Sequence, residues 1–410
     1  MAFEHATEIA PAALGQDRRA AALYALLCVA VAFAWQLLTV HYNYGGNWSA
    51  LFQTGSSWTL PPGPAFEGTY RHQNTQGFDG QFYRYIANDP FFTRNFQQYV
   101  DLPRFRWPRI LVPGLAFILA LGQPAWIDAA YSAVILAFLF LGVYWLSRYA
   151  LQHGRHPAWG LLFALIPAAT IAVERLTVDI ALAALCVGFV FHASEKHSRP
   201  LYLILALAPL TRETGLILPG ACFLASSLRG QWRKAAASAA TILPCLLWLV
   251  YVRAHTAPTP IDWGRYFVPY PLGGILRFTL DPRLPAEAST WKEAIAGPLD
   301  YLALLGVWLA LFSSARWLWR RQWGPVEFAV GGFLLLTLLL AHFPTWGEAY
   351  SFGRYLSPLL VWLAMHGLAQ RRAGPLVPLG LVALRVLAQL TPQTIGIFAG
   401  LLGAETPLPF

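Results

Sequence analysis

Long apolar runs recur along almost the whole of this 410-residue chain, and they limit what it can fold into. A helix needs about 20 apolar residues to cross the hydrocarbon core of a bilayer. The first run, at about residues 20–40, reads AAALYALLCVAVAFAWQLLTV and has this length. Because a bilayer admits helices whose backbone groups are satisfied internally, we expect an all-α protein that crosses a membrane many times.

The later apolar segments share this character and differ mainly in length. They lie at 109–123, 125–147, 157–173, 177–194, 200–211, 214–228, 235–253, 296–315, 325–343, 354–370 and 374–402, the last interrupted at TPQT. The sequence therefore predicts a polytopic membrane protein with about 10–11 transmembrane or re-entrant helices. No internal repeat is evident by eye, and residues 1–410 read as a single integral-membrane domain.

Composition supports this class. Only 12% of residues are charged, whereas about one quarter are charged in a typical soluble protein. The net charge of +9 comes from short basic clusters between apolar runs, which is typical of membrane topology signals. We therefore expect no nucleic-acid partner. The four cysteines lie inside apolar segments and read as small buried residues, not as a disulfide or metal framework.

The basic clusters also predict an orientation. They lie at Arg18–Arg19, Arg148 and Arg155, Lys196 and Arg199, Arg229 to Lys234, Arg316 to Arg321, and Arg371–Arg372. Placing them all in the cytoplasm satisfies the positive-inside rule and puts the N-terminus there too. The segment 109–123 then reads as a re-entrant or in-plane helix. Two large loops, 41–108 and 254–295, fall on the outer side.

The first outer loop contains the motif QGFDGQFYRYIANDP, residues 76–90. Asp79 precedes a short helical pattern, so one interpretation is that it caps this helix. The alternative is catalysis, because a carboxylate near aromatic rings can act as a general base. Gln81, Tyr83 and Tyr85 are residue types that hold sugars. We favour Asp79 as the catalytic residue and these three as substrate-binding residues.

Two further charged groups stand at the ends of apolar segments, where a charge costs about 2.5–3.5 kcal/mol on insertion scales. The stretch ERLTVD places Glu174 and Asp179 around a turn at the outer boundary, as substrate-binding candidates or as part of an interfacial ion pair. The stretch TRETG places Arg212 and Glu213 between two short apolar helices. Arginine is a natural clamp for phosphate, although a buried pair that fixes a helical hairpin is the alternative.

Two arginine-containing stretches complete the candidates. LPRFRWPRI carries Arg104, Arg106 and Arg109, which we expect either to bind a lipid phosphate or to make ordinary headgroup contacts. TWGEAYSFGRY carries further substrate-binding candidates, Trp346, Glu348 and Arg354. Arg354 is at the start of the next span, on the outer side. The alternative to substrate binding is that its side chain snorkels to the membrane interface. Nucleotide-binding glycine loops, His-Glu-x-x-His helices and Gly-x-Ser-x-Gly elbows do not occur in the sequence.

Taken together, these motifs resemble the GT-C superfamily of integral-membrane glycosyltransferases. GFDGQFYRYIANDP is similar to a Tyr/Phe-Asp-Gly-Gln-Phe-Tyr element of a bacterial family of multi-spanning proteins, and distantly to a first-loop element of the GPI mannosyltransferases. NWSALFQTG, TRETGLIL and FGRYLSP look like further elements of that bacterial family. The resemblance covers most of the chain through short motifs.

The resemblance implies an inverting transferase on the outer, periplasmic face of a bacterial inner membrane. Its donor would be a polyprenyl-phosphate sugar, and its acceptor a glycan, lipid or protein of the cell envelope. Asp79 would be the base, and Arg212 or Arg354 would hold the lipid phosphate. Asp79 lies further from the first helix than is usual in the superfamily, so Glu67 is an alternative base. No cofactor is certain, and a divalent metal remains open.

Two rival functions follow from the same features. A lipid or solute transporter would show repeated halves with broken helices at corresponding positions. The short segments 200–211 and 214–228 form one candidate for such a break. A polysaccharide polymerase or ligase would show an arginine-rich outer loop with few acids, whereas both outer loops carry acids as well.

Overall fold

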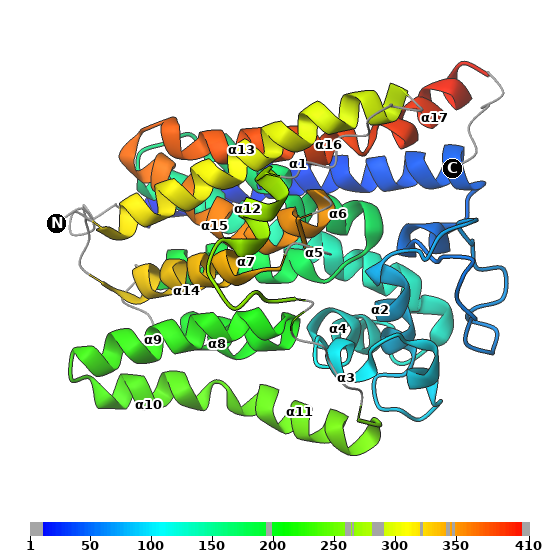
Figure 1. Ribbon diagram of the computed structural model, residues 1–410, viewed down its shortest axis with the longest axis horizontal. Helices are drawn as coiled ribbons and strands as arrows, with labels where there is room; N and C mark the ends of the chain where they lie inside the picture. Colours follow the sequence, from blue (N-terminus) through cyan, green and yellow to red (C-terminus); the bar gives the residue numbers. More distant parts are fainter. Residues whose placement is uncertain are drawn as a thin grey trace.

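A computed structural model of the protein describes residues 11–193, 199–258, 264, 266–280, 291–319, 323–341, 345–346 and 349–403. Within these ranges the regular secondary structure is helical, and the only β-type pairing is in isolated bridges. The prediction of an all-α protein is therefore confirmed. Most helices run nearly parallel to one long axis and form a bundle (Figure 1).

Among the described residues, four helical segments are long and apolar enough to cross a membrane, and two bent helix pairs raise the number to six if each is one span. The four are α1 (Pro11–Tyr44), α5 (Pro124–Gln152), α10 (Trp232–Ala240) joined to α11 (Leu243–His255), and α13 (Trp291–Trp319). The bent pairs are η3 (Pro157–Leu165) with α6 (Pro167–Arg175), at 63°, and η7 (Gly374–Leu376) and α16 (Val377–Ala388) with α17 (Thr391–Leu401), at 51°. The chain is an α-helical membrane protein.

The predicted 10–11 helices include re-entrant ones, and several of the predicted segments form helices that are shorter than a full span. These are α4 (Leu111–Leu119), α7 (Asp179–Ala193), α8 (Arg199–Thr211), η4 (Glu213–Leu216) with α9 (Ile217–Leu228), and α14 (Pro325–Leu339). At about 1.5 Å per residue, α4 is only about 14 Å long. That agrees with the prediction that 109–123 is not a full crossing. The predicted segment 157–173 is broken at Ile166, before Pro167.

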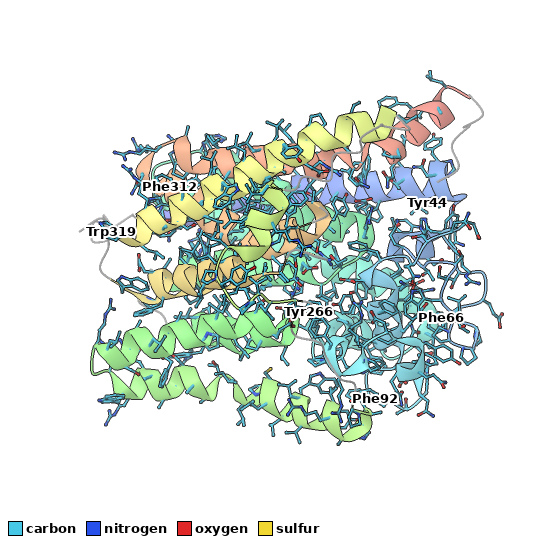
Figure 2. All side chains as sticks on the ribbon, in the orientation of Figure 1. Tyr44, Phe66, Phe92, Tyr266, Phe312 and Trp319 are labelled. Carbon is cyan, nitrogen blue, oxygen red and sulfur yellow. The ribbon has the colours of Figure 1, made fainter. Side chains whose placement is uncertain are left out.

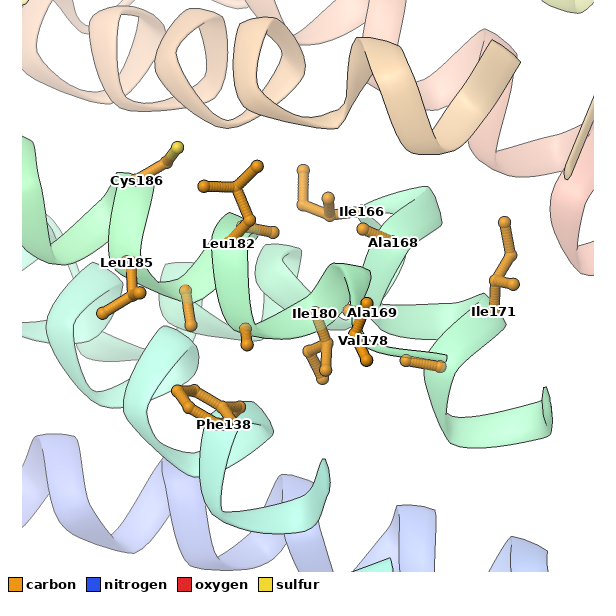
Figure 3. Packing of buried hydrophobic residues seen from close by; sticks show 14 of the residues in the cluster. Phe138, Ile166, Ala168, Ala169, Ile171, Val178, Ile180, Leu182, Leu185 and Cys186 are labelled. Atoms are coloured by element: carbon orange, nitrogen blue, oxygen red, sulfur yellow. The ribbon is translucent and has the colours of Figure 1, made fainter. Parts of the chain in front are cut away.

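The centre of the bundle is α15 (Ala349–Gln370), which is buried on most of its surface and packs against α6, α7, α13, α14 and α16. Beside it, α7 is buried along nearly its whole length. Figure 3 shows the small and branched side chains that fill this region, among them Ala168, Ile180 and Leu182. Their small size lets α6 and α7 approach the neighbouring helices closely.

Apolar side chains cover the outer surface of the bundle. Val31 on α1, Val250 on α11 and Phe312 on α13 are each more than 60% exposed. Phe312 and Trp319 lie along the outside of α13 (Figure 2). Such a large exposed apolar surface, continuous over several helices, is typical of protein that faces lipid.

The first loop folds into a compact cap at one end of the bundle. Because α1 continues to Tyr44, this loop is slightly shorter than the predicted 41–108. It contains η1 (Trp48–Phe52), α2 (Asp79–Asn88), η2 (Phe96–Tyr99) and α3 (Pro103–Arg106). The helices α2, α3 and α4 pack at this end of the bundle, which we call the loop end. The α9–α10 turn and the C-terminal end of α13, which carry basic residues, lie at the opposite end (Figure 1).

The second predicted loop, 254–295, is described only in part. It begins at the end of α11 and contains α12 (Gly273–Leu280). Residues 259–263, 265 and 281–290 lie outside the described residues. Phe267 pairs with Leu340 in an isolated bridge, so this loop lies against the end of α14.

Candidate functional site

Asp79 is the first residue of α2, and its carboxylate is held by two arginines. The N-cap is Phe78, and it makes no side-chain cap bond, so the alternative interpretation, in which Asp79 caps the helix, is wrong. The Asp79 side chain instead accepts from Arg354 Nη1 at 2.6 Å and pairs with Arg106 Nη1 at 3.0 Å. Arg106 is bound at the same time to Asp101.

The charge state of Asp79 follows from this arrangement. Its side chain is 24% exposed, and burial by itself raises the pKa of the carboxyl. The guanidinium groups of Arg106 and Arg354 outweigh burial and hold the pKa of Asp79 well below its usual range. Asp79 is therefore ionised at neutral pH, and in this arrangement it is a weak base.

Two glycines allow the loop to bring Asp79 to this position. Gly77 has a φ of 73°, in the left-handed region that favours glycine. A Cβ on Gly80 would lie 2.3 Å from the carbonyl oxygen of Arg175. Because no side chain fits there, Gly80 lets the start of α2 rest directly against the C-terminal end of α6.

Arg354 connects Asp79 to a second buried acid. Its Nη1 lies 3.5 Å from Asp179, the first residue of α7, whose carboxylate also pairs with Arg212. The guanidinium of Arg212 lies over the ring of Tyr355, 4.6 Å from its centre. Asp79, Arg354, Asp179 and Arg212 thus form one continuous series of ion pairs from α2 to the end of α8.

A small cavity of about 10 Å³ opens beside these residues. Asp179, Arg212, Thr214 and Arg354 line it with polar groups. Its remaining wall is mainly apolar, with Leu182 and Ala183 of α7, Phe333 and Leu336 of α14, and Pro358 of α15. Arg212 is 5% exposed, and its Nε has no hydrogen-bond partner among the described residues. The cavity therefore joins a wall that carries two arginines and their partner Asp179 to a mainly apolar wall.

Arg109 and Glu213 form a separate pair next to this series. Arg109 donates to both carboxylate oxygens of Glu213, at 2.9 and 3.1 Å, and to the Tyr83 hydroxyl at 2.9 Å. Burial raises the pKa of the Tyr83 phenol. This bidentate pair ties the start of α4 to the turn between α8 and α9. Glu213 remains 44% exposed on its side chain.

Several predicted site residues make contacts that hold the protein's own backbone. Arg104 donates to the carbonyl oxygens of Arg253 and Thr256 at the end of α11, which takes it away from the site. Gln81 is buried and holds the loop through Gly55 N and Gln76 O.

Tyr85 and Trp346 are also buried, at 0% and 1% exposed, and Trp346 donates to the carbonyl of Leu340. Neither side chain is free to contact a substrate in this arrangement. Glu348 lies outside the described residues. Glu67, the alternative base, is exposed in the first loop.

Glu174 belongs to a different cluster at the end of α6. Its carboxylate accepts from the Tyr350 hydroxyl and, at 3.0 Å, from the Gln393 amide. Arg175 Nε lies 3.5 Å away. The Arg175 guanidinium is stacked between Phe78 and Tyr350, at 4.6 and 4.5 Å from the ring centres. Glu174 and Asp79 therefore lie on two sides of one arginine–aromatic stack.

The sequence interpretation did not select Asp101, Arg175 or Gln393 as site residues. A polar amide inside an apolar run is itself a signal, and it could have identified Gln393. Arg175 belongs to the charged stretch ERLTVD, where a Glu–Arg pair is the alternative to a site, whereas Asp101 lies among other polar residues and gives no comparable signal. Among the described residues no group of three or more His, Cys, Asp or Glu side chains could hold a metal ion.

No protein-family model matches the chain, and neither does any curated protein or any solved structure. The site is therefore interpreted from its own geometry. A larger cavity of about 640 Å³ lies elsewhere, between the first loop and the start of α5. Phe66, Phe96 and Arg94 are among its lining residues, and Asp79 is not.

Proposed function

We propose that the protein is an inverting membrane glycosyltransferase that moves a sugar from a polyprenyl-phosphate donor to an acceptor hydroxyl. One observation carries the proposal: Arg354 contacts the carboxylate of Asp79 and also lines the cavity beside Arg212. A base and a cationic phosphate site thus lie within the reach of one side chain. Transfer from a sugar phosphate needs both of these groups.

The two walls of the cavity favour a lipid-linked donor. Arg212 and Arg354 would hold the phosphate, and the free Nε of Arg212 supplies a donor for one of its oxygens. Because the cavity of about 10 Å³ has room for about one water, the helices around it would have to move apart to admit the donor, and Leu182, Phe333 and Leu336 would then contact the first units of the lipid chain. A water-soluble sugar phosphate would have no use for this apolar wall.

The reaction would proceed at Asp79. Its carboxylate would take the proton of the acceptor hydroxyl, while the acceptor oxygen attacks the anomeric carbon of the sugar. The bond between that carbon and the phosphate oxygen breaks, and the lipid phosphate leaves with the electron pair, held by the arginines. An arriving phosphate competes with Asp79 for Arg354. Releasing Asp79 from this pair raises its pKa and makes it a stronger base.

The resemblance to the GT-C superfamily supports the same reaction. It is the ground for placing the site on the periplasmic face of a bacterial inner membrane, with the N-terminus in the cytoplasm. The acceptor would then be a glycan, lipid or protein of the cell envelope. The separation of the first-loop cap from the basic connections is consistent with this orientation.

The test is a transfer assay on purified protein in lipid vesicles, with a panel of polyprenyl-phosphate sugars. We expect wild type to consume a donor and Asp79→Asn to consume it at least about a hundredfold more slowly. Asp101→Asn is a matched control, because Asp101 pairs with the same Arg106 and is similarly exposed, at 25%. Full activity of Asp79→Asn would overturn the assignment of the base.

Transport of an anionic lipid is the second candidate, and the two bent helix pairs favour it. Broken helices near a binding site are common in transporters. In this protein the two helices of each broken pair are bent relative to each other by 63° and 51°. A flux assay separates the two functions. Movement of polyprenyl-phosphate sugar across the vesicle, with the sugar–phosphate bond intact, would replace transfer with transport.

A further inference from the structure

A polar stripe runs along one face of α1, a helix whose other faces are mostly apolar. Gln36, Thr39 and Asn43 are spaced i, i+3 and i+7 and share a face. Gln36 and Thr39 are at most 2% exposed, whereas Leu37 beside them is 46% exposed. The stripe faces α6 and α17, since Gln36 Nε2 donates to the carbonyl of Val173 and Asn43 Nδ2 to that of Gln393.

Acceptor oxygens are left over in this stripe. Gln36, Asn43 and Gln393 each use the NH₂ of the amide to bind a carbonyl or carboxylate oxygen, which fixes the orientation of each amide. Their amide oxygens are buried and receive no donor from the described residues. The Thr39 hydroxyl is buried without a partner as well. An unsatisfied buried acceptor costs about 1–3 kcal/mol, so four of them along the interface of α1 with α6 and α17 point to a ligand.

We propose that this cluster, Gln36, Thr39, Asn43, Gln393 and Glu174, is a binding site for neutral hydroxyl donors. The unsatisfied groups are acceptors, so the ligand must bring O–H or N–H groups. A metal cation is disfavoured because Arg175 already balances the charge of Glu174 at 3.5 Å. An anion is disfavoured because the carboxylate and the amide oxygens repel it. Water and sugar hydroxyls share the required chemistry.

The position of the cluster gives it a role in the proposed transfer. Arg175 joins it to the site, through its stack on Phe78 and through its carbonyl against Gly80. The cluster therefore lies on the α6 side of Asp79, whereas the cavity at Arg212 lies on the α7 side. If sugar hydroxyls occupy it, the cluster is the acceptor subsite. The assignment of the cluster to sugar hydroxyls rests on the proposed function, whereas its occupation by water does not.

Cysteine accessibility tests the site without any transfer reaction. In a background with the four native cysteines replaced by alanine, Gln36→Cys, Thr39→Cys and Gln393→Cys are treated with aqueous Ag⁺, an ion about the size of water. We expect these thiols to react quickly and Leu37→Cys, on the lipid-facing side, to react at least tenfold more slowly. Thiols at 36, 39 and 393 that react no faster than the one at 37 would overturn the proposal.

A second labelling experiment, with and without a glycolipid, distinguishes water from sugar hydroxyls as the ligand. The same variants are labelled in phosphatidylcholine vesicles with and without a neutral galactosyl diacylglycerol. Slower labelling with the glycolipid assigns the site to sugar hydroxyls. Equal labelling in both vesicles assigns it to water. Both outcomes require reactive thiols and support the hydroxyl-donor site, and neither depends on whether the protein transfers sugar.

Thr39→Val is a second test that leaves the shape of the side chain unchanged. If the hydroxyl is satisfied by a ligand, valine loses that interaction, and we expect the melting temperature to fall by about 1–2 °C. Leu38→Val, on the lipid-facing side, controls for the change to a branched side chain on α1. A melting temperature that rises for Thr39→Val, relative to this control, would show a dry hydroxyl and contradict the proposal.

Discussion

Asp79 and Glu174 lie on two sides of the Arg175 stack, yet the protein holds the two acids in opposite ways. Asp79 is bound by the guanidinium groups of Arg106 and Arg354. Glu174 is bound chiefly by neutral donors, the Tyr350 hydroxyl and the Gln393 amide. A cationic surrounding suits exchange with an anionic ligand, and a neutral one suits hydroxyl groups. The comparison agrees with the proposals of a phosphate on the Asp79 side and of neutral ligands on the Glu174 side.

The largest expected effect is on catalysis at Asp79. Asp79→Asn keeps the shape of the side chain but removes the proposed base, so we expect the rate of the proposed sugar transfer to fall by about 10²–10⁴-fold. The readout is consumption of the polyprenyl-phosphate donor that wild type uses. An equal loss in Asp101→Asn would mean that Arg106, and not Asp79, is the sensitive group.

Asp179 provides the sharpest stability test of the charged side. Asp179→Asn leaves Arg212 buried without its ion-pair partner, which typically costs about 3–5 kcal/mol. We expect a markedly lower melting temperature in detergent. Glu67→Gln is the control, because Glu67 is exposed in the first loop and a change at such a surface position usually alters stability by less than about 0.5 kcal/mol. Similar melting temperatures for the two variants would contradict the burial argument.

Gly80→Ala tests the contact between α2 and α6 that holds the two sides together. The new Cβ would lie 2.3 Å from the Arg175 carbonyl oxygen, so α2 must shift. A displacement of about 1 Å can cost about a hundredfold in rate, and we expect a loss of that size in transfer. Gly220→Ala on α9 meets nothing within 4 Å and should keep wild-type activity.

A substitution at Glu174, on the neutral side, should reduce stability less than a substitution at Asp179, on the charged side. Glu174→Gln can still accept from the Tyr350 hydroxyl, and the Gln393 amide can turn to present its free oxygen. We expect a destabilisation of about 1–2 kcal/mol, smaller than that of Asp179→Asn, by thermal unfolding. A larger loss than in Asp179→Asn would show that the charge of Glu174 matters more than its neutral contacts indicate.

The smallest effect is expected at Arg104, which lies outside both sides. Its donors hold carbonyl oxygens at the end of α11, so Arg104→Gln should cost about 0.3–1 kcal/mol of stability. The KM for the lipid-phosphate donor should stay unchanged. A KM raised tenfold with unchanged kcat would return Arg104 to the set of phosphate-binding residues.

The sequence by itself determined the helices and their main breaks. Long apolar runs required helices, because a helix satisfies its own backbone groups inside a membrane. The predicted interruption at TPQT is the start of α17, and ERLTVD is the connection between α6 and α7, where the prediction placed a turn. The sequence also selected Asp79, Asp179, Arg212 and Arg354, because charged groups beside apolar runs are costly unless they are used.

Only the tertiary structure decided which of these groups meet. Asp79 and Arg354 are 275 residues apart, and no local pattern pairs them. Their contact depends on α15 lying at the centre of the bundle and on Gly80 resting against the end of α6. Periodicity shows that a face is apolar but not which helix covers it. For the same reason Gln36 meets Val173, and Gln393 meets Glu174, only when α1, α6 and α17 pack together.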